Sequence, residues 1–211
     1  TLTDANLTGA NLTGTTLSGV VSGGITGIPS ALSVEWQVIS GYLLGPGVNL
    51  SNLLMKEVNL TGATLNHANL AYTTLFRANL TDTDLANADL TNTNLNQAIL
   101  ANATLSGAAM LNTKLQKTDL FGATLIDTVD LHTTKGTPYY YSNTTLPEGF
   151  DPVAKEWILT PYCDFTPDAA CDLADINQMY ETGDLVTGVG VSEYFPGRLL
   201  KPDLIPNAHR N

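Results

Sequence analysis

Leucine recurs at every fifth position over most of the first 130 residues, and this spacing is the strongest constraint on the fold. A small residue, most often Ala or Thr, stands two places before each leucine. A period of five fits neither a helix of 3.6 residues per turn nor an alternating strand. A coil with five residues on each side explains it, with the leucine and the small residue inside. The series comprises Leu7, Leu12 and Leu17, then Leu50 to Leu105 with Met55 in register, then Met110, Leu115, Leu120 and Leu125.

The motif A-(N/D/T)-L-x-x resembles the pentapeptide-repeat family. It runs without a break through residues 48–127 and also covers residues 5–19. The resemblance implies an all-β fold, a right-handed quadrilateral parallel β-helix with twenty residues in each coil. It also implies a scaffold or binding protein that is not an enzyme.

Three inner threonines give internal support for four sides per coil. Thr73, Thr93 and Thr113 are spaced by twenty residues, so we expect them to stack in one column of the coil. Their hydroxyls would then hydrogen-bond along that column, because a buried polar group needs a partner. The competing interpretation is chance, because Thr83 and Thr118 hold inner positions outside that column.

The repeat pattern divides the chain. We expect N-terminal repeats at 1–19, a hairpin-like insertion at 20–47, the main β-helix at 48–131, a C-terminal cap at 132–160, a calcium-binding loop and helix at 161–183, and a tail at 184–211. Glycines and prolines mark turns in the insertion. Its Trp36 is expected to pack against the solenoid, and the alternative is a sugar-binding platform with Tyr42.

The register slips at Asp130-Leu131, where we expect the repeat to end. Aromatic residues of the following segment, Tyr139 to Tyr141 and Phe150, are expected to cover the last open coil. At the other end the chain opens inside the pattern, and we expect that end of the solenoid to lack a cap.

A candidate calcium loop lies at 164–175. The expected ligands, spaced as in an EF-hand-type loop, are the side chains of Asp164, Thr166, Asp168, Asp172 and Asp175 and the carbonyl of Ala170. The final Asp resembles a dockerin-type loop, but the chain has one such loop where dockerins have two. Ala169 stands where the turn usually needs Gly. The alternative is a solvated acidic loop without metal.

Cys163 and Cys171 are the only cysteines, and they bracket part of this loop. A pair that close in sequence favours a local disulfide in an oxidising compartment. Two reduced thiols are the alternative.

The net charge of −11 is concentrated toward the C-terminus. Residues 48–131 carry seven acids and four bases, which argues against nucleic-acid binding through a basic surface. All four bases, however, fall on one of the four expected faces: Lys56, Arg77, Lys114 and Lys117. We expect this interaction face to meet an acidic surface of the chain's own C-terminal region, a neighbouring subunit or an anionic polysaccharide.

No catalytic arrangement is apparent, because the histidines are scattered and no nucleophile, base and acid fall in a catalytic pattern. No segment is long and apolar enough for a membrane span. The sequence predicts an extracellular or cell-surface structural scaffold that is stabilised by calcium and assembles end to end. A calcium-dependent adhesin or polysaccharide-binding envelope protein is the alternative. A DNA-mimic gyrase-binding protein is less favoured, because mimicry needs a dense negative surface.

Overall fold

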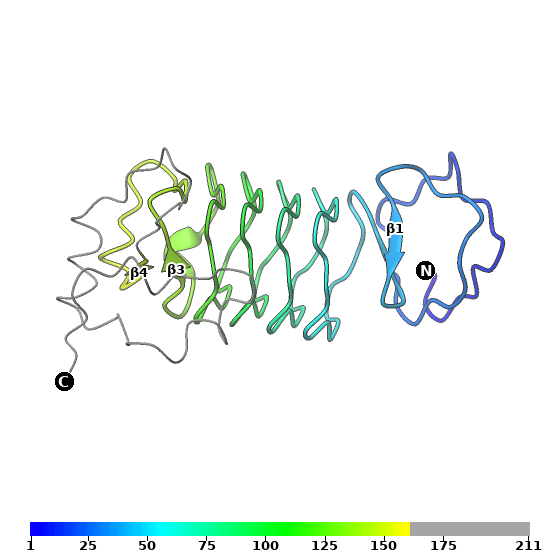
Figure 1. Cartoon of the computed structure of the whole chain (residues 1–211), viewed down its shortest axis with the longest axis horizontal. Coiled ribbons are helices and arrows are strands. Elements are labelled where there is room, and N and C mark those ends of the chain that lie inside the picture. The colour runs from blue at the N-terminus through cyan, green and yellow to red at the C-terminus, as the bar shows by residue number, and fades with distance from the viewer. Residues whose placement is uncertain (161–211) are drawn as a thin grey trace, which may run out of the picture. The chain divides into compact units, whose positions relative to one another are not determined.

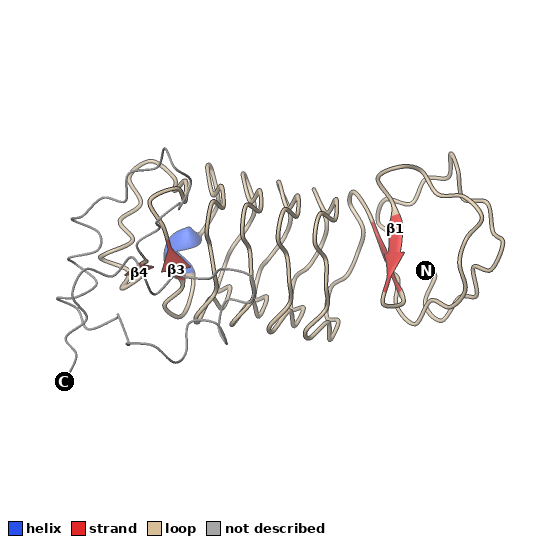
Figure 2. Ribbon diagram, viewed as in Figure 1, coloured by secondary structure: helices blue, strands red, loops and turns tan. Residues whose placement is uncertain are grey.

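The computed structural model describes residues 1–160. Its named elements are short: the strands β1 (Gln37–Ile39) and β2 (Tyr42–Leu44), the 3-10 helix η1 (Leu131–Thr133), and the strands β3 (Tyr139–Tyr140) and β4 (Ile158–Leu159). Most of the described chain consists of turns joined by single parallel β-bridges, and Figure 2 therefore draws the coils as loops.

The bridges establish a coil of twenty residues. Asn69 pairs with Asp89 and Asp89 with Ala109, and the same step of twenty links the other three sides between residues 54 and 124. The N–H of Leu70 donates to the carbonyl of Asp89 in the next coil (2.8 Å), and the N–H of Asp89 donates back to the carbonyl of Ala68 (2.9 Å). The predicted four-sided parallel β-helix is thus confirmed, and its right-handed sense stays an implication of the family resemblance. Five stacked coils are labelled here as A (48–67), B (68–87), C (88–107), D (108–127) and E (128–149) (Figure 1).

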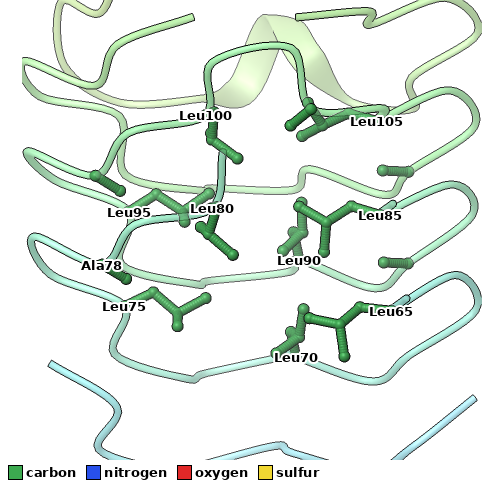
Figure 3. Close-up of a cluster of buried hydrophobic side chains, with 14 of the residues drawn as sticks. Leu65, Leu70, Leu75, Ala78, Leu80, Leu85, Leu90, Leu95, Leu100 and Leu105 are labelled. Carbon is green, nitrogen blue, oxygen red and sulfur yellow. The ribbon is translucent and has the colours of Figure 1, made fainter. Parts of the chain in front are cut away.

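Leucines fill the interior of these coils. In Figure 3, Leu65, Leu85 and Leu105 stack in one column, and the leucines of the other sides point into the same interior. The central leucines from Leu60 to Leu125 are fully buried, as are most of the alanines two places before them. Each buried leucine contributes about 1.5–3 kcal/mol before the entropy cost of ordering the chain. Stability comes from stacking, because a coil covers the leucines of its neighbours.

The fifth residue of each repeat turns the corner. It has a left-handed backbone in most repeats, for example at Asp82 (φ 57°), Asn92 (φ 56°) and Lys117 (φ 56°). Asn and Asp tolerate this conformation better than most residues, and glycine adopts it without strain. The polar fifth position of the motif is therefore explained by backbone geometry as well as by exposure.

The buried threonines bond to the coil below and do not bond to one another. Thr73, Thr93 and Thr113 donate to the carbonyls of Leu50, Leu70 and Leu90 at 2.6 to 2.7 Å. Thr83 and Thr118 make the same bond to Leu60 and Leu95. The prediction that the threonine hydroxyls hydrogen-bond to one another along a column is therefore wrong. The five bonds come from more than one side of the coil, so an inner threonine is not restricted to one column.

The hairpin of β1 and β2 is inserted into a coil that otherwise continues the ladder. Residues before it pair with the first coil, Thr26 with Asn6 and Ala31 with Asn11. The two strands are antiparallel, with Ile39 opposite Tyr42, so Ser40 (φ 51°) and Gly41 (φ 79°) form the turn. Positive φ at both positions is typical of the type I′ turn, whose twist suits a two-residue hairpin.

The coil continues beyond the register slip, although the sequence repeat ends there and we expected the β-helix to end with it. Coil E forms without repeat sequence: Lys114 pairs with Lys135, Asp119 with Tyr139 and Thr124 with Thr145. The first and last of these steps are 21 residues and the middle one is 20. The helix η1, preceded by Asp130 in the left-handed region (φ 60°), absorbs the first extra residue.

Aromatic residues cover the core next to coil E. Trp157 is 5% exposed, and its ring lies 4.9 Å from that of Phe150 and 6.4 Å from that of Tyr140. β4 extends the ladder beyond coil E by pairing in parallel with β3. Tyr139 is part of coil E, and Trp157 joins the central cluster of buried side chains.

Candidate functional site: the lysine face

One side of the stacked coils, which we call the lysine face, gathers the bases of the β-helix. It is formed by residues 53–57, 73–77, 93–97, 113–117 and 134–138. The bridges Leu54 to Thr74, Thr74 to Asn94, Asn94 to Lys114 and Lys114 to Lys135 run along its middle. The structure thus places all four sequence-predicted bases on this side and adds Lys135. The sequence period missed Lys135 because η1 shifts the register by one residue before it.

A polar column runs along one corner of this face. The guanidinium of Arg77 lies 3.8 Å from the carboxylate of Glu57 in coil A, and its Nε donates to Oε1 of Gln97 in coil C (2.9 Å). It also lies 5.0 Å from the centre of the Phe76 ring. The positive charge of Arg77 in coil B is therefore balanced by the carboxylate of Glu57 in coil A. Lys117 occupies the same corner in coil D.

Lys114 and Lys135 are paired across adjacent coils and both are exposed. Bridged residues lie one strand spacing apart, about 4.8 Å. The rest of this face in coils D and E contains no acid in the described residues. Like charges in such a pair destabilise a sheet, so the arrangement has a cost that a partner of opposite charge would remove.

A further lysine has a structural role in the segment after coil E. Lys155 Nζ donates to the carbonyl of His132 (2.8 Å) and lies 3.4 Å from that of Thr134. Both carbonyls belong to the region around η1. This contact ties the segment after coil E to the residues around η1.

Tyr140 lies next to the aromatic residues that cover the core, and the pKa of its hydroxyl is displaced. Partial burial raises the pKa of its hydroxyl above the ordinary value, and the nearby carboxylate of Asp151 raises it further. The adjacent Trp157 has a buried Nε1 with no hydrogen-bond partner among the described residues. Aromatic packing of Tyr140 and Phe150 against Trp157 closes this region.

Trp36 packs against the protein. Its ring lies against Gly45, where an added Cβ would overlap it, and Trp36 also contacts both clusters of buried side chains. Tyr42 is half-buried, and its hydroxyl lies 3.4 Å from the carbonyl of Leu54. The packing interpretation of Trp36 accounts for these contacts.

The predicted calcium ligands Asp164, Thr166, Asp168, Ala170, Asp172 and Asp175, and the cysteines Cys163 and Cys171, lie outside the described residues. Within residues 1–160 no group of three or more His, Cys, Asp or Glu side chains could hold a metal ion. Over the same residues, no helix has the length and apolarity to cross a membrane.

The family model described as pentapeptide repeats matches this chain in 8 copies, over residues 1–21, 47–82 and 83–122. The chain therefore carries pentapeptide repeats on both sides of the hairpin.

Solved structures of pentapeptide repeat proteins are similar to this chain. One from Nostoc is 28% identical, with 53% of this chain and 84% of that chain covered and a TM-score of 0.38. HetL from Nostoc, involved in heterocyst differentiation regulation, is 26% identical over 60% of this chain and 62% of its own, with a TM-score of 0.26. The plasmid-mediated fluoroquinolone resistance protein QnrB1 is 15% identical over 85% of both chains, with a TM-score of 0.38. No curated protein matches the chain in sequence.

Proposed function

We propose that the protein is a non-enzymatic scaffold whose β-helix presents flat, chemically distinct faces to a macromolecular partner. The observation that carries this proposal is that different positions of each repeat lie inside and outside the coil. The leucine and the small residue are buried in the core, and the three other positions form continuous outer faces. Function then depends on a rigid surface, and no single reactive group is needed.

The ladder supports the required rigidity. Each coil donates and accepts backbone hydrogen bonds with the coils on both sides, at 2.7 to 3.1 Å from coil A to coil E. Surfaces built on such a frame are held in place before a partner arrives, and preorganisation lowers the entropy cost of binding. The outer side chains are mostly short and polar, so they leave the faces flat.

Hydrogen–deuterium exchange on the full chain tests this proposal. We expect the amides of the leucines from Leu60 to Leu125 to exchange as one slowly opening unit, because each is bonded to the next coil. Fast exchange throughout coils B to D would contradict a rigid scaffold.

The extracellular location, the calcium ion and the end-to-end assembly remain predictions from the sequence. Electron microscopy of the full chain at increasing concentration, with calcium or with a chelator, tests assembly and calcium together. Particles that stay monomeric in both conditions would rule out the filament.

A further inference from the structure

The face opposite the lysine face carries carboxylates at matching levels. We call it the carboxylate face, formed by residues 63–67, 83–87, 103–107, 123–127 and 144–149. The two faces are separated by one side of the four-sided coil in either direction, so they point away from each other. The acids of the carboxylate face are Asp84, Asp127 and Glu148.

The charges of the two faces correspond coil by coil. Coil B has Arg77 on the lysine face and Asp84 on the carboxylate face. Coil C has no charged residue on either face. Coil D has Lys114 and Lys117 opposite Asp127, and coil E has Lys135 opposite Glu148. Coil A is neutral on both faces, since Lys56 and Glu57 balance and His67 is counted as neutral.

This register has a geometric consequence. If one molecule is moved sideways without rotation, its lysine face meets the carboxylate face of the next molecule with every coil at the same level. Asp127 and Glu148 are exposed in coils D and E, the two coils in which Lys114 and Lys135 lie in adjacent strands. A neighbouring copy therefore compensates both like-charged sets at once. An external polyanion would compensate the lysines alone.

We propose that copies of this chain associate side by side, lysine face against carboxylate face, in parallel and in axial register. This contact rests on the proposed scaffold function and names its partner as a second copy of the chain. The two faces are different surfaces, so the contact is heterologous and each added copy leaves one of each face open. Such a contact does not close on itself and extends into a row.

The contact is electrostatic and therefore weak and salt-dependent, because exposed ion pairs are individually weak and are screened by salt. The charges of coils D and E carry it. In coils A and B, Arg77 already has Glu57 beside it. The net charge of −11 opposes association of any two copies. A test must therefore distinguish the effect of where the charges lie from the effect of the net charge of the chain.

Two double charge reversals make this separation in the full chain. Lys114→Glu with Lys135→Glu makes the lysine face net negative in coils D and E, where Lys117 is then its only base, and changes the formal charge of the chain from −11 to −15. Asp127→Lys with Glu148→Lys makes both faces basic and changes it from −11 to −7. Lysine is accepted at the left-handed corner of Asp127, since Lys117 has the same φ of about 56° in the same coil. The matched control is Asp82→Lys with Asp4→Lys, which also gives −7 but lies on the other two sides of the coil.

Sedimentation velocity is measured at about 0.01 M and about 1 M ionic strength, where the Debye length is roughly 30 Å and 3 Å. The wild type and the control should associate at low salt and dissociate at high salt. Each face variant alone should stay monomeric, and an equimolar mixture of the two should associate again, because each then supplies the face that the other needs.

Three outcomes would overturn the lateral contact: a monomeric wild type at low salt, association of the basic-face variant to the same extent as its control, or no recovery in the mixture. Dextran sulfate serves as a probe for the competing occupant. If it binds the wild type, fails to bind the Lys114/Lys135 variant, and the wild type does not self-associate, the lysine face is a polyanion site. Hydrogen exchange of coils B to D tests the scaffold separately, so either proposal can fail alone.

Discussion

The hydroxyl of Thr93 donates a hydrogen bond of 2.7 Å to the carbonyl of Leu70, which lies one coil below. The same carbonyl accepts the N–H of Thr73 at 3.1 Å. One carbonyl oxygen therefore closes a turn within its own coil and joins that coil to the next. Both threonines are fully buried, so neither bond competes with water.

Replacing Thr93 with Val tests the contribution of this bond, because the two side chains have nearly the same shape. We expect a loss of about 0.5–1.5 kcal/mol in the free energy of unfolding, measured by urea denaturation. The carbonyl of Leu70 keeps its backbone donor, which favours the lower half of that range. Thr91→Val, on the outer surface, is the control and should change stability by less than about 0.5 kcal/mol. Equal effects at the two positions would show that the buried hydroxyl contributes nothing.

Truncation of a core leucine should be far more costly than truncation of an outer one. Leu90 is fully buried, whereas Leu111 is 38% exposed. We expect Leu90→Ala to lower the free energy of unfolding by about 2–5 kcal/mol, because it leaves a cavity between stacked coils. Leu111→Ala is the matched control, and urea denaturation compares the two. A loss at Leu111 that equals the loss at Leu90 would be inconsistent with the observed core.

Gly45 and Trp36 should be energetically coupled. A Cβ on Gly45 would overlap the Trp36 ring, so Gly45→Ala should destabilise the protein by about 1–3 kcal/mol through overpacking. Trp36→Leu removes the ring, and the double variant should lose less stability than the sum of the two single variants. A double-mutant cycle by thermal unfolding measures this coupling. Strict additivity would mean that the two residues do not meet.

The raised pKa of Tyr140 gives the protein a stability dependence at alkaline pH. The folded-state pKa lies above the unfolded value of about 10, because burial and then Asp151 disfavour the phenolate. The corresponding stability is fully present below pH 10 and is lost as the pH rises through the folded-state pKa. Unfolding by urea at several pH values should show this loss in the wild type and a smaller one in Tyr140→Phe. Asp151→Asn should lower the Tyr140 pKa only in part, since burial is the larger cause. An unchanged alkaline profile in Tyr140→Phe would exclude Tyr140 as its source.

The loop at 164–175 predicts one calcium ion per full chain. Isothermal titration calorimetry should show a single site, and the double variant Asp164→Asn with Asp168→Asn should lose it, because calcium needs six to eight oxygen ligands. Asp151→Asn, outside the loop, is the control. A chelator that leaves both the calorimetric and the thermal unfolding curves of the wild type unchanged would favour the solvated acidic loop.

The five-residue spacing was sufficient to predict which residues are buried, whereas the four sides and the period of twenty came from the resemblance to the pentapeptide-repeat family. The buried residues follow from the local sequence, because each repeat places its leucine and its small residue inside the coil. Coil E could not be predicted in this way, because the segment around Thr134 and Tyr139 keeps the backbone ladder without the leucine pattern. There the pairing partner in coil D dictates the conformation, and that information is not local.

The candidate site likewise has a part that the sequence period predicts and a part that it does not. The period predicted that Lys56, Arg77, Lys114 and Lys117 share a side, and Lys135 was missed because η1 adds one residue before it. The role of Trp157 at the end of the core was missed for a related reason. A single tryptophan in an irregular segment has no period, so its place depends on contacts with Phe150 and Tyr140.

The twenty-residue coil also restricts how such a chain can change in length during evolution. A duplication of four pentapeptides would add one coil and leave every later side chain on its original face. A duplication of one pentapeptide would rotate all later repeats by a quarter turn and scramble the faces. The hairpin avoids this penalty, because it leaves and re-enters the coil at neighbouring points, and the bridge from Val21 to Asn49 spans 28 residues without altering the phase of the coils that follow. New loops can therefore be acquired at the corners of the coil, whereas the number of residues between two corners on the same face must stay a multiple of twenty within the regular repeats.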